Sequence, residues 1–175
     1  MSQNLSRNSV FHWYAVSVRP NSEKSTAAAL IERGVKTFSP HFTTRRLWSD
    51  RTKDLEVPLF PGYVFCALEP STPAARLSVA GVIGLNGRGQ GPVVVDEREI
   101  LHIQTLCDSG FPVQPWPFVS EGTKIQVASG PLRGVGGILI GHQKLVVSLR
   151  LLQRSVAVDL SGSEFEVSST ASTGN

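Results

Sequence analysis

The stretch PLFPGYVF, residues 58–65, decides how the first half of this chain is interpreted. Its apolar and aromatic residues are typical of a buried β-strand. Pro61 and Gly62 interrupt that strand, because proline has no N–H to donate and glycine has no side chain to pack. We therefore expect one long strand, residues 55–68, with a break that pushes the neighbouring rings outward. Aromatic residues at such positions often anchor interfaces.

Strand and helix patterns surround this stretch in a regular order. The apolar run 13–18 predicts a first buried strand, which Pro20 ends. Glu99, three residues after Asp96, resembles a capping box at a helix start. The expected elements are a strand at 13–18, a helix from Asn21 or Ser22 to Gly34, strands at 36–47 and 55–68 around a polar tip at 49–53, a short helix from Thr72 to Gly81, a strand at 92–95, and a helix from Asp96. This order predicts an α+β domain, a split βαβ (RNP-like) sandwich with one extra helix.

A proline-rich segment divides the chain. Three prolines lie between residues 112 and 117, and each fixes φ and removes a backbone donor. We expect a first domain at 11–110 and a semi-rigid linker at 111–119.

The second domain, at 120–167, lacks a helix start. Short strands are expected at 123–127, 135–140, 145–149 and 155–160, which predicts a small SH3-like β-barrel. Gly136-Gly137 suggests a bend or bulge at a barrel corner. The Ser/Thr/Gly tail, residues 168–175, is expected to be disordered.

Composition excludes several classes of protein. The 175 residues are 41% hydrophobic, enough for a packed core, and the net charge of +3 does not demand a polyanionic partner. No apolar run approaches the roughly 20 residues of a membrane-spanning helix, and residues 1–10 lack the apolar core of a signal peptide. Cys66 and Cys107 have no CxxC spacing, so buried thiols are expected, although a disulfide stays open. Histidines are scattered. We expect a cytoplasmic monomer without catalytic residues, cofactor or metal.

Two motifs resemble a known family. WYAV at 13–16 and residues 58–65 resemble the N-terminal domain of bacterial NusG-type transcription factors, and EGT at 121–123 with GPLRG at 130–134 resembles a KOW domain. The resemblance spans nearly everything from Trp13 to Leu160. It implies a non-enzymatic elongation or antitermination factor whose N-terminal domain binds the clamp helices of RNA polymerase. Residues 45–51 and 151–158 resemble the UpxY-type paralogues, which are antiterminators of long operons.

The resemblance also assigns residues. The polymerase-binding patch would comprise Trp13, Phe60, Pro61, Gly62 and Tyr63, although the three aromatic residues could instead fill the core. The KOW turn would meet a ribosomal protein or Rho through Gly130, Pro131, Leu132, Arg133 and Gly134, although Leu132 could equally plug the barrel.

The hairpin tip forms a third candidate site. The resemblance places it near upstream or non-template DNA, or near the polymerase, with Arg45, Arg46, Trp48 and Arg51 as contacts. Asp50, Asp54 and Glu56 lie among these cations and weaken a positive field. The alternative is a solvated tip, although an exposed Trp48 favours a partner.

A different function is also compatible with the sequence. Gly62-Tyr63-Val64-Phe65 on a split βαβ domain resembles the aromatic octamer of RNA-recognition motifs, which bind RNA by stacking bases. Pro61, however, stands where that octamer has Lys or Arg. The alternative is therefore an RNA-binding or ribosome-associated protein with a KOW barrel.

Overall fold

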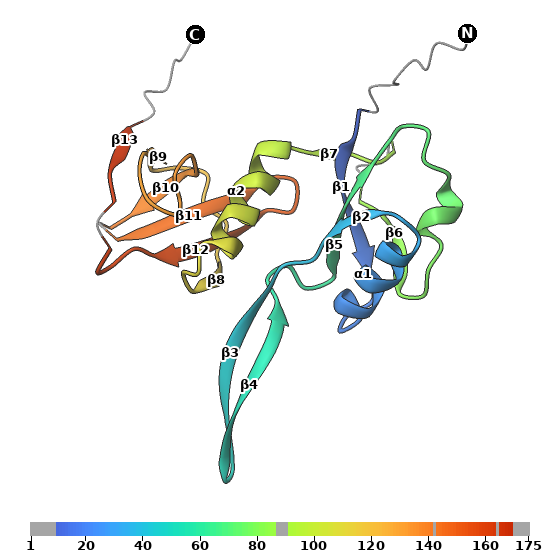
Figure 1. Cartoon of the computed structure of the whole chain (residues 1–175), viewed down its shortest axis with the longest axis horizontal. Coiled ribbons are helices and arrows are strands. Elements are labelled where there is room, and N and C mark those ends of the chain that lie inside the picture. Colours follow the sequence, from blue (N-terminus) through green and yellow to red (C-terminus); the bar gives the residue numbers. More distant parts are fainter. Residues whose placement is uncertain (1–9, 87–90, 142, 164, 170–175) are drawn as a thin grey trace, which may run out of the picture. The chain divides into compact units, whose positions relative to one another are not determined.

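Strands β1 and β5 form the centre of an antiparallel sheet in the computed structural model, which describes residues 10–86, 91–141, 143–163 and 165–169. They pair with Trp13 opposite Ala67 and Val16 opposite Val64. This sheet belongs to the first of two units, residues 10–38 with 62–94. Its elements are β1 (His12–Val18), α1 (Glu23–Glu32), β2 (Lys36–Phe38), β5 (Tyr63–Leu68), the 3₁₀ helix η1 (Ala74–Leu77), β6 (Val82–Leu85) and β7 (Val94–Val95), with the strand order β2-β5-β1-β6 and β7 beside β1 (Figure 1).

Helix α1 covers one face of this sheet. Leu30 of α1 packs in one buried cluster with Val16, Val18, Val64 and Cys66. Alternate residues of a strand point to opposite faces. The other face of the sheet therefore carries the residues between these, including Trp13, Ala15 and Phe65.

The expected long strand at 55–68 is two strands in different sheets. β4 (Arg51–Pro58) ends before the Pro61-Gly62 step, and β5 starts after it at Tyr63. Gly62 has a φ of +84°, a left-handed conformation that glycine adopts without steric cost. The break therefore separates two strands instead of distorting one.

The second unit contains residues 39–61 and 95–169. It holds a six-stranded sheet in the order β13-β9-β10-β11-β12-β8, a two-stranded ribbon and one helix (Figure 1). The four strands predicted for a small barrel are all present, each within one residue of the expected bounds. The elements are β3 (His41–Trp48), β4, α2 (Glu97–Asp108), β8 (Val113–Trp116), β9 (Thr123–Val127), β10 (Gly136–Ile140), β11 (Lys144–Leu149), β12 (Arg154–Asp159) and β13 (Val167–Ser169).

The expected linker is part of the barrel sheet. Strand β8 pairs antiparallel with β12, with Pro115 opposite Val156. An edge strand tolerates proline, because a missing N–H there leaves no neighbour without a partner. Lys144 adds a contact, with its Nζ 4.1 Å from the centre of the Trp116 ring. The expectation of a linker without strand structure is therefore corrected for residues 113–116.

Two further expectations change at the domain borders. Residues 95–110, which we expected in the first domain, group with the second unit, where α2 packs against β11. Ser168 and Ser169, expected in a disordered tail, belong to β13, which pairs with β9. The rest of that tail, 170–175, lies outside the described residues.

Gly136 and Gly137 do not form the expected bend or bulge in β10, and they leave space for neighbouring atoms. The pairing of β10 with β9 runs through both residues without a register shift. A Cβ atom added to Gly137 would lie 2.5 Å from the carbonyl oxygen of Val146 on β11. The glycine therefore permits close approach of two backbones.

Candidate functional site

The loop between β4 and β5 has a defined conformation set partly by α1. Glu23, the first residue of α1, is 3% exposed. Its Oε1 accepts a hydrogen bond of 2.8 Å from the N–H of Gly62, and the Gly62 carbonyl accepts one of 2.9 Å from the N–H of Val18. A buried carboxylate needs such a partner, because burial without one is costly. Both polar groups of Gly62 are thus held by residues of the first unit.

A second hydrogen bond involves the residue just before Gly62. Nη1 of Arg154, at the start of β12, donates to the carbonyl oxygen of Pro61 at 2.9 Å. No local sequence pattern singles out Glu23 or Arg154 for this loop. A carboxylate in the first turn of a helix is expected for the helix dipole alone, and an arginine at a strand start is common.

The predicted aromatic patch is mostly buried. Trp13 is 5% exposed and Phe60 1% exposed, whereas Tyr63 and Gly62 are half-buried and Pro61 is exposed. The expectation that the break pushes both neighbouring rings outward is therefore corrected for Phe60. Since the chain turns between two strands at Pro61-Gly62, the ring before the turn and the ring after it have different surroundings.

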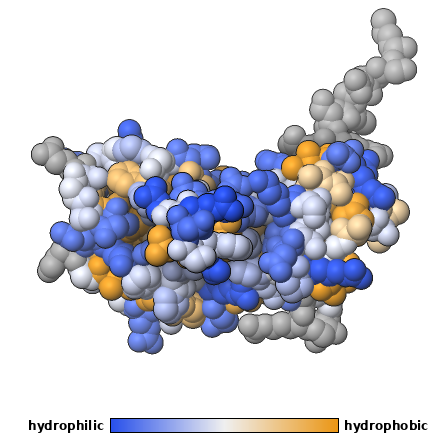
Figure 2. Space-filling view, turned by 90° about the horizontal axis from the view of Figure 1, so that it is seen from below, coloured by the Kyte–Doolittle hydropathy of each residue, from blue (hydrophilic) through white to orange (hydrophobic). Residues whose placement is uncertain are grey.

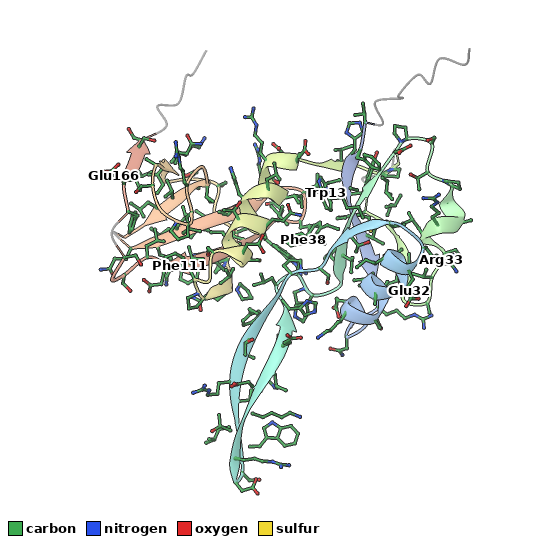
Figure 3. All side chains as sticks on the ribbon, in the orientation of Figure 1. Trp13, Glu32, Arg33, Phe38, Phe111 and Glu166 are labelled. Atoms are coloured by element: carbon green, nitrogen blue, oxygen red, sulfur yellow. The ribbon has the colours of Figure 1, made fainter. Side chains whose placement is uncertain are left out.

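Trp13 and Tyr63 share a sheet face without being neighbours. Trp13 lies opposite Ala67, and Tyr63 lies opposite Ser17. Four residues along a strand separate these positions, which is about 13 Å. Figure 3 shows Trp13 and Phe38 on the side of the sheet away from α1. There Nζ of Lys36 lies 5.6 Å from the centre of the Trp13 ring, and Phe38 packs on Phe65 with centroids 6.2 Å apart.

In the KOW turn between β9 and β10, residues 130–134, Leu132 is buried and the other four residues are exposed. Leu132 is 3% exposed, beside a cavity of about 40 Å³ that Phe111, Leu160 and Phe165 also line. Gly130, Pro131, Arg133 and Gly134 are exposed. Of the two alternatives for Leu132, the structure therefore supports the one in which its side chain fills the interior of the barrel.

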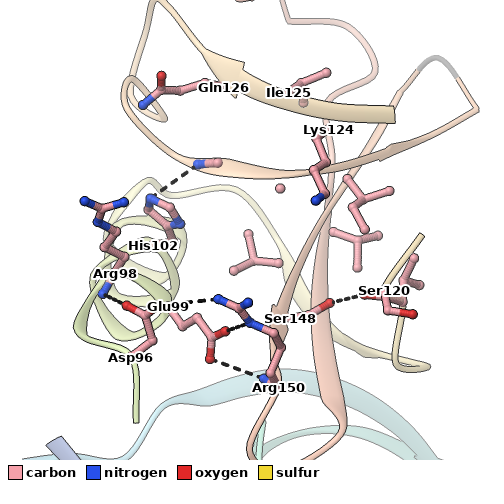
Figure 4. Close-up of a pocket in the computed structure, with 16 residues that line it drawn as sticks. Asp96, Arg98, Glu99, His102, Ser120, Lys124, Ile125, Gln126, Ser148 and Arg150 are labelled. Atoms are coloured by element: carbon pink, nitrogen blue, oxygen red, sulfur yellow. Dashed lines mark hydrogen bonds and ion pairs between the residues drawn. The ribbon is translucent and has the colours of Figure 1, made fainter. Parts of the chain in front are cut away.

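A groove of about 710 Å³ lies between α2 and the barrel strands, within the second unit (Figure 4). The Asp96 side chain accepts from the N–H of Arg98 and caps α2, as predicted. Glu99 does not complete a capping box. Instead its Oε1 accepts from Nε of Arg150 at 2.6 Å, and its Oε2 accepts from the backbone N–H of Arg150 at 3.2 Å. Glu99 and Arg150 therefore neutralise one another on the wall of the groove.

His102 adds a second connection across this groove. Its Nε2 accepts a hydrogen bond of 3.4 Å from the N–H of Gly136, which requires that nitrogen to be unprotonated. Burial lowers the pKa of His102 below its usual value, and this outweighs the opposing effect of Asp96. The neutral ring thus ties α2 to the barrel. Within the described ranges, no group of three or more His, Cys, Asp or Glu side chains could hold a metal ion.

Comparison with known proteins decides the family. The family model described as "Transcription termination factor nusG" matches residues 11–104, which is over half of the chain. The chain belongs to the NusG family. This confirms the resemblance found at residues 13–16 and 58–65, and with it the α+β fold class.

Curated relatives in the NusG family align over most of their length. The transcription termination/antitermination protein NusG of Helicobacter pylori strain J99 is 22% identical over 174 residues, covering 88% of this chain and 97% of the relative. NusG of Lactococcus lactis is 24% identical over 171 residues, covering 88% and 91%. A solved structure of Thermotoga maritima NusG is similar at 26% identity and a TM-score of 0.49, covering 90% of this chain and 97% of that one.

Cys66 and Cys107 of this NusG-family chain are both free thiols, so the disulfide that the sequence left open is absent. Burial raises the pKa of each thiol to about 11. In the part of the chain that is described, no helix is long and apolar enough to cross a membrane.

Proposed function

We propose that this chain is a transcription elongation or antitermination regulator that binds the clamp helices of RNA polymerase through the loop Phe60–Tyr63. The observation that supports this most is the loop's preorganisation. Glu23 and Val18 hold both polar groups of Gly62, while Pro61 is exposed and Tyr63 half-buried. A loop already held in one conformation loses little entropy when a partner binds.

We assign two roles within the predicted patch according to burial. Pro61 and Tyr63 supply the contact surface of the loop, since they retain accessible area. Trp13 and Phe60 are buried, at 5% and 1% exposed, and we assign them to the protein interior instead of the contact surface. An aromatic ring with one packed side and one accessible side is typical of interface anchors.

Tyr63→Ala tests this assignment. We expect polymerase affinity to fall by about 2 kcal/mol, roughly 30-fold, as for a central aromatic anchor. Tyr14→Ala is a matched control, because Tyr14 is also half-buried on the central sheet but packs against the α1 cluster. It should lower the thermal midpoint and leave the affinity of the folded protein unchanged. Equal affinity of Tyr63→Ala and the parent protein, with both folded, would exclude the loop as the docking site.

The barrel supplies a second contact in this proposal. Pro131 and Arg133 are the exposed side chains of the KOW turn, and we assign them the contact with a ribosomal protein or Rho. Residues 45–51 and 151–158 resemble the UpxY-type paralogues, which are antiterminators of long operons. We therefore favour an operon-specific antiterminator, acting without catalysis or cofactor as a cytoplasmic monomer. A comparison of transcript profiles with and without the gene tests this specificity.

The RNA-recognition alternative is less consistent with the structure. Stacking of bases needs exposed rings on the central strands. Phe65, which occupies such a position in the octamer-like stretch, has no exposed area.

A further inference from the structure

The groove between α2 and the barrel strands has a size suited to a small ligand. Its volume of about 710 Å³ lies within the range of roughly 300–1,000 Å³ that is typical of small-molecule sites. One wall comes from α2 and the other from β9, β10 and β11, all within the second unit (Figure 4). A ligand in the groove would therefore contact two separate segments of the chain.

The barrel wall of the groove is apolar. Ile125, Ile138 and Val146 line it, and all three are buried. Gly136 and Gly137 belong to the same wall and place no side chain in the groove. Glycine inside a strand often marks a position where a ligand or another backbone approaches closely. This wall therefore suits the apolar body of a ligand.

Apolar residues are distributed differently on the surface outside the groove. On the face shown in Figure 2, hydrophobic residues lie singly or in small groups among hydrophilic ones. Scattered residues of this kind are normal on a soluble protein and indicate no partner. The groove differs because its apolar residues lie together in a recess.

The charged residues that line the groove differ in how they are paired. Asp96 and Glu99 both bind Arg150, at 3.4 Å and 2.6 Å. Arg98 and Lys124 are exposed, and in the described part of the chain neither forms an ion pair. Lys124 extends from β9 into the space between α2 and the barrel (Figure 4). Each wall therefore supplies one cation whose charge is available to a ligand.

We propose that this groove binds a small organic anion with an apolar body. The acidic group pairs with Arg98 and Lys124, and the apolar body packs on the barrel wall. An inorganic anion would use the cations alone, and a neutral apolar molecule would use the barrel wall alone. Because the ligand contacts both α2 and the barrel, its binding stabilises the folded form in which the two are packed together.

This inference is independent of the loop that we assign to polymerase, since residues 60–63 do not line the groove. Arg98 and Lys124 are exposed, so neutral substitutions at these positions should leave the fold intact.

The test measures displacement of a fluorescent anionic amphiphile, anilinonaphthalene sulfonate, from the full chain. The competitors octanoate, acetate, octanol and octylammonium separate the effect of charge from that of the apolar body. We expect octanoate to compete at least about 10-fold more strongly than acetate or octanol, because only octanoate engages both the cations and the barrel wall. Octylammonium should not compete. Phenylpropionate in place of octanoate distinguishes an aromatic from an aliphatic body.

Substitutions then locate the site. Lys124→Met and Arg98→Met should each weaken octanoate binding about 5- to 10-fold, between the effects of losing an exposed ion pair and a hydrogen bond to a charged group. Lys124→Arg keeps the positive charge and should stay within about 2-fold of the parent. Lys53→Met is the matched control, because Lys53 is exposed on β4 and does not line the groove. Octanoate should also raise the Tm of the parent, and should raise that of Lys124→Met less.

Several outcomes would overturn the inference. Equal competition by octanol and octanoate would show that the cations take no part. Equal losses for Lys124→Met and Lys53→Met would show that only net charge matters. So would the absence of any displacement by octanoate or phenylpropionate at about 10 mM, where a ligand of ordinary efficiency binds, remove the assignment. Polymerase affinity measured without octanoate should be the same for Lys124→Met and the parent, which keeps this result separate from the loop proposal.

Discussion

Gly136 and Gly137 of β10 allow a paired test of the barrel's close packing. A Cβ at Gly137 would lie 2.5 Å from the Val146 carbonyl oxygen and 2.8 Å from Cδ1 of Leu145. A Cβ at Gly136 would lie 3.2 Å from Cε1 of His102, a side chain that can shift. The carbonyl belongs to a paired strand and cannot move without disturbing β11.

The magnitudes follow from these contacts. Each Gly→Ala change stabilises by about 0.4–1 kcal/mol through the unfolded chain, provided that the native backbone tolerates it. Overpacking against fixed atoms costs about 1–3 kcal/mol and occasionally more. Gly136→Ala should therefore lie near the parent stability, whereas Gly137→Ala should be less stable than Gly136→Ala by about 1–3 kcal/mol. In a chain of this size that difference corresponds to about 2–12 °C in Tm.

Urea unfolding followed by circular dichroism measures both variants under one condition. The unfolded-state contribution is the same for two adjacent glycines, so the difference between the variants reports the native contacts alone. Equal midpoints for Gly136→Ala and Gly137→Ala would refute the close approach of β10 and β11.

The remaining predictions concern the barrel turn, the groove and the thiols. Leu132→Ala should destabilise the protein by about 2–5 kcal/mol in urea unfolding, as for other buried leucines; a loss below about 0.5 kcal/mol would show that Leu132 faces a partner instead. The pKa of His102 is lowered in the folded protein, so the free energy of unfolding should fall as pH drops below about 6.5, where the unfolded chain takes up the proton. The His102→Gln variant should lose this pH dependence. An unchanged pH dependence in the variant would contradict the role of neutral His102 as the acceptor from Gly136. Because the pKa of Cys107 is raised to about 11, its alkylation by iodoacetamide should still accelerate about tenfold per pH unit from pH 7 to 9; a plateau near pH 8.5 would mean an ordinary thiol.

Strand β9 was predictable because it alternates apolar and polar residues, and the other three predicted barrel strands because they are short and rich in Val, Ile and Leu. Lys124 and Gln126 point outward while Ile125 and Val127 are buried, which is the pattern of a half-buried strand. Strand β8 escaped prediction because its apolar residues are interrupted by Pro115. Only the pairing with β12 shows that this proline lies on an edge.

The assignment of residues to the candidate sites depended on the pairing register of the strands, which a single sequence does not supply. Arg45 and Arg46 are equivalent as sequence neighbours, yet the pairing places one beside Asp54 and the other beside Lys53. Trp13 and Phe60 were compatible with either core or surface, because an aromatic residue in a strand suits both. The bond from Gly62 to Glu23 joins residues 39 positions apart, and no local pattern announces such a contact.

The most direct test of the central proposal is binding to purified RNA polymerase with and without its clamp helices. We expect the full chain to bind intact polymerase, and we expect deletion of the clamp helices to weaken binding at least as much as Tyr63→Ala does, roughly 30-fold or more. Equal affinity for the intact and the deleted polymerase would contradict docking through the loop Phe60–Tyr63.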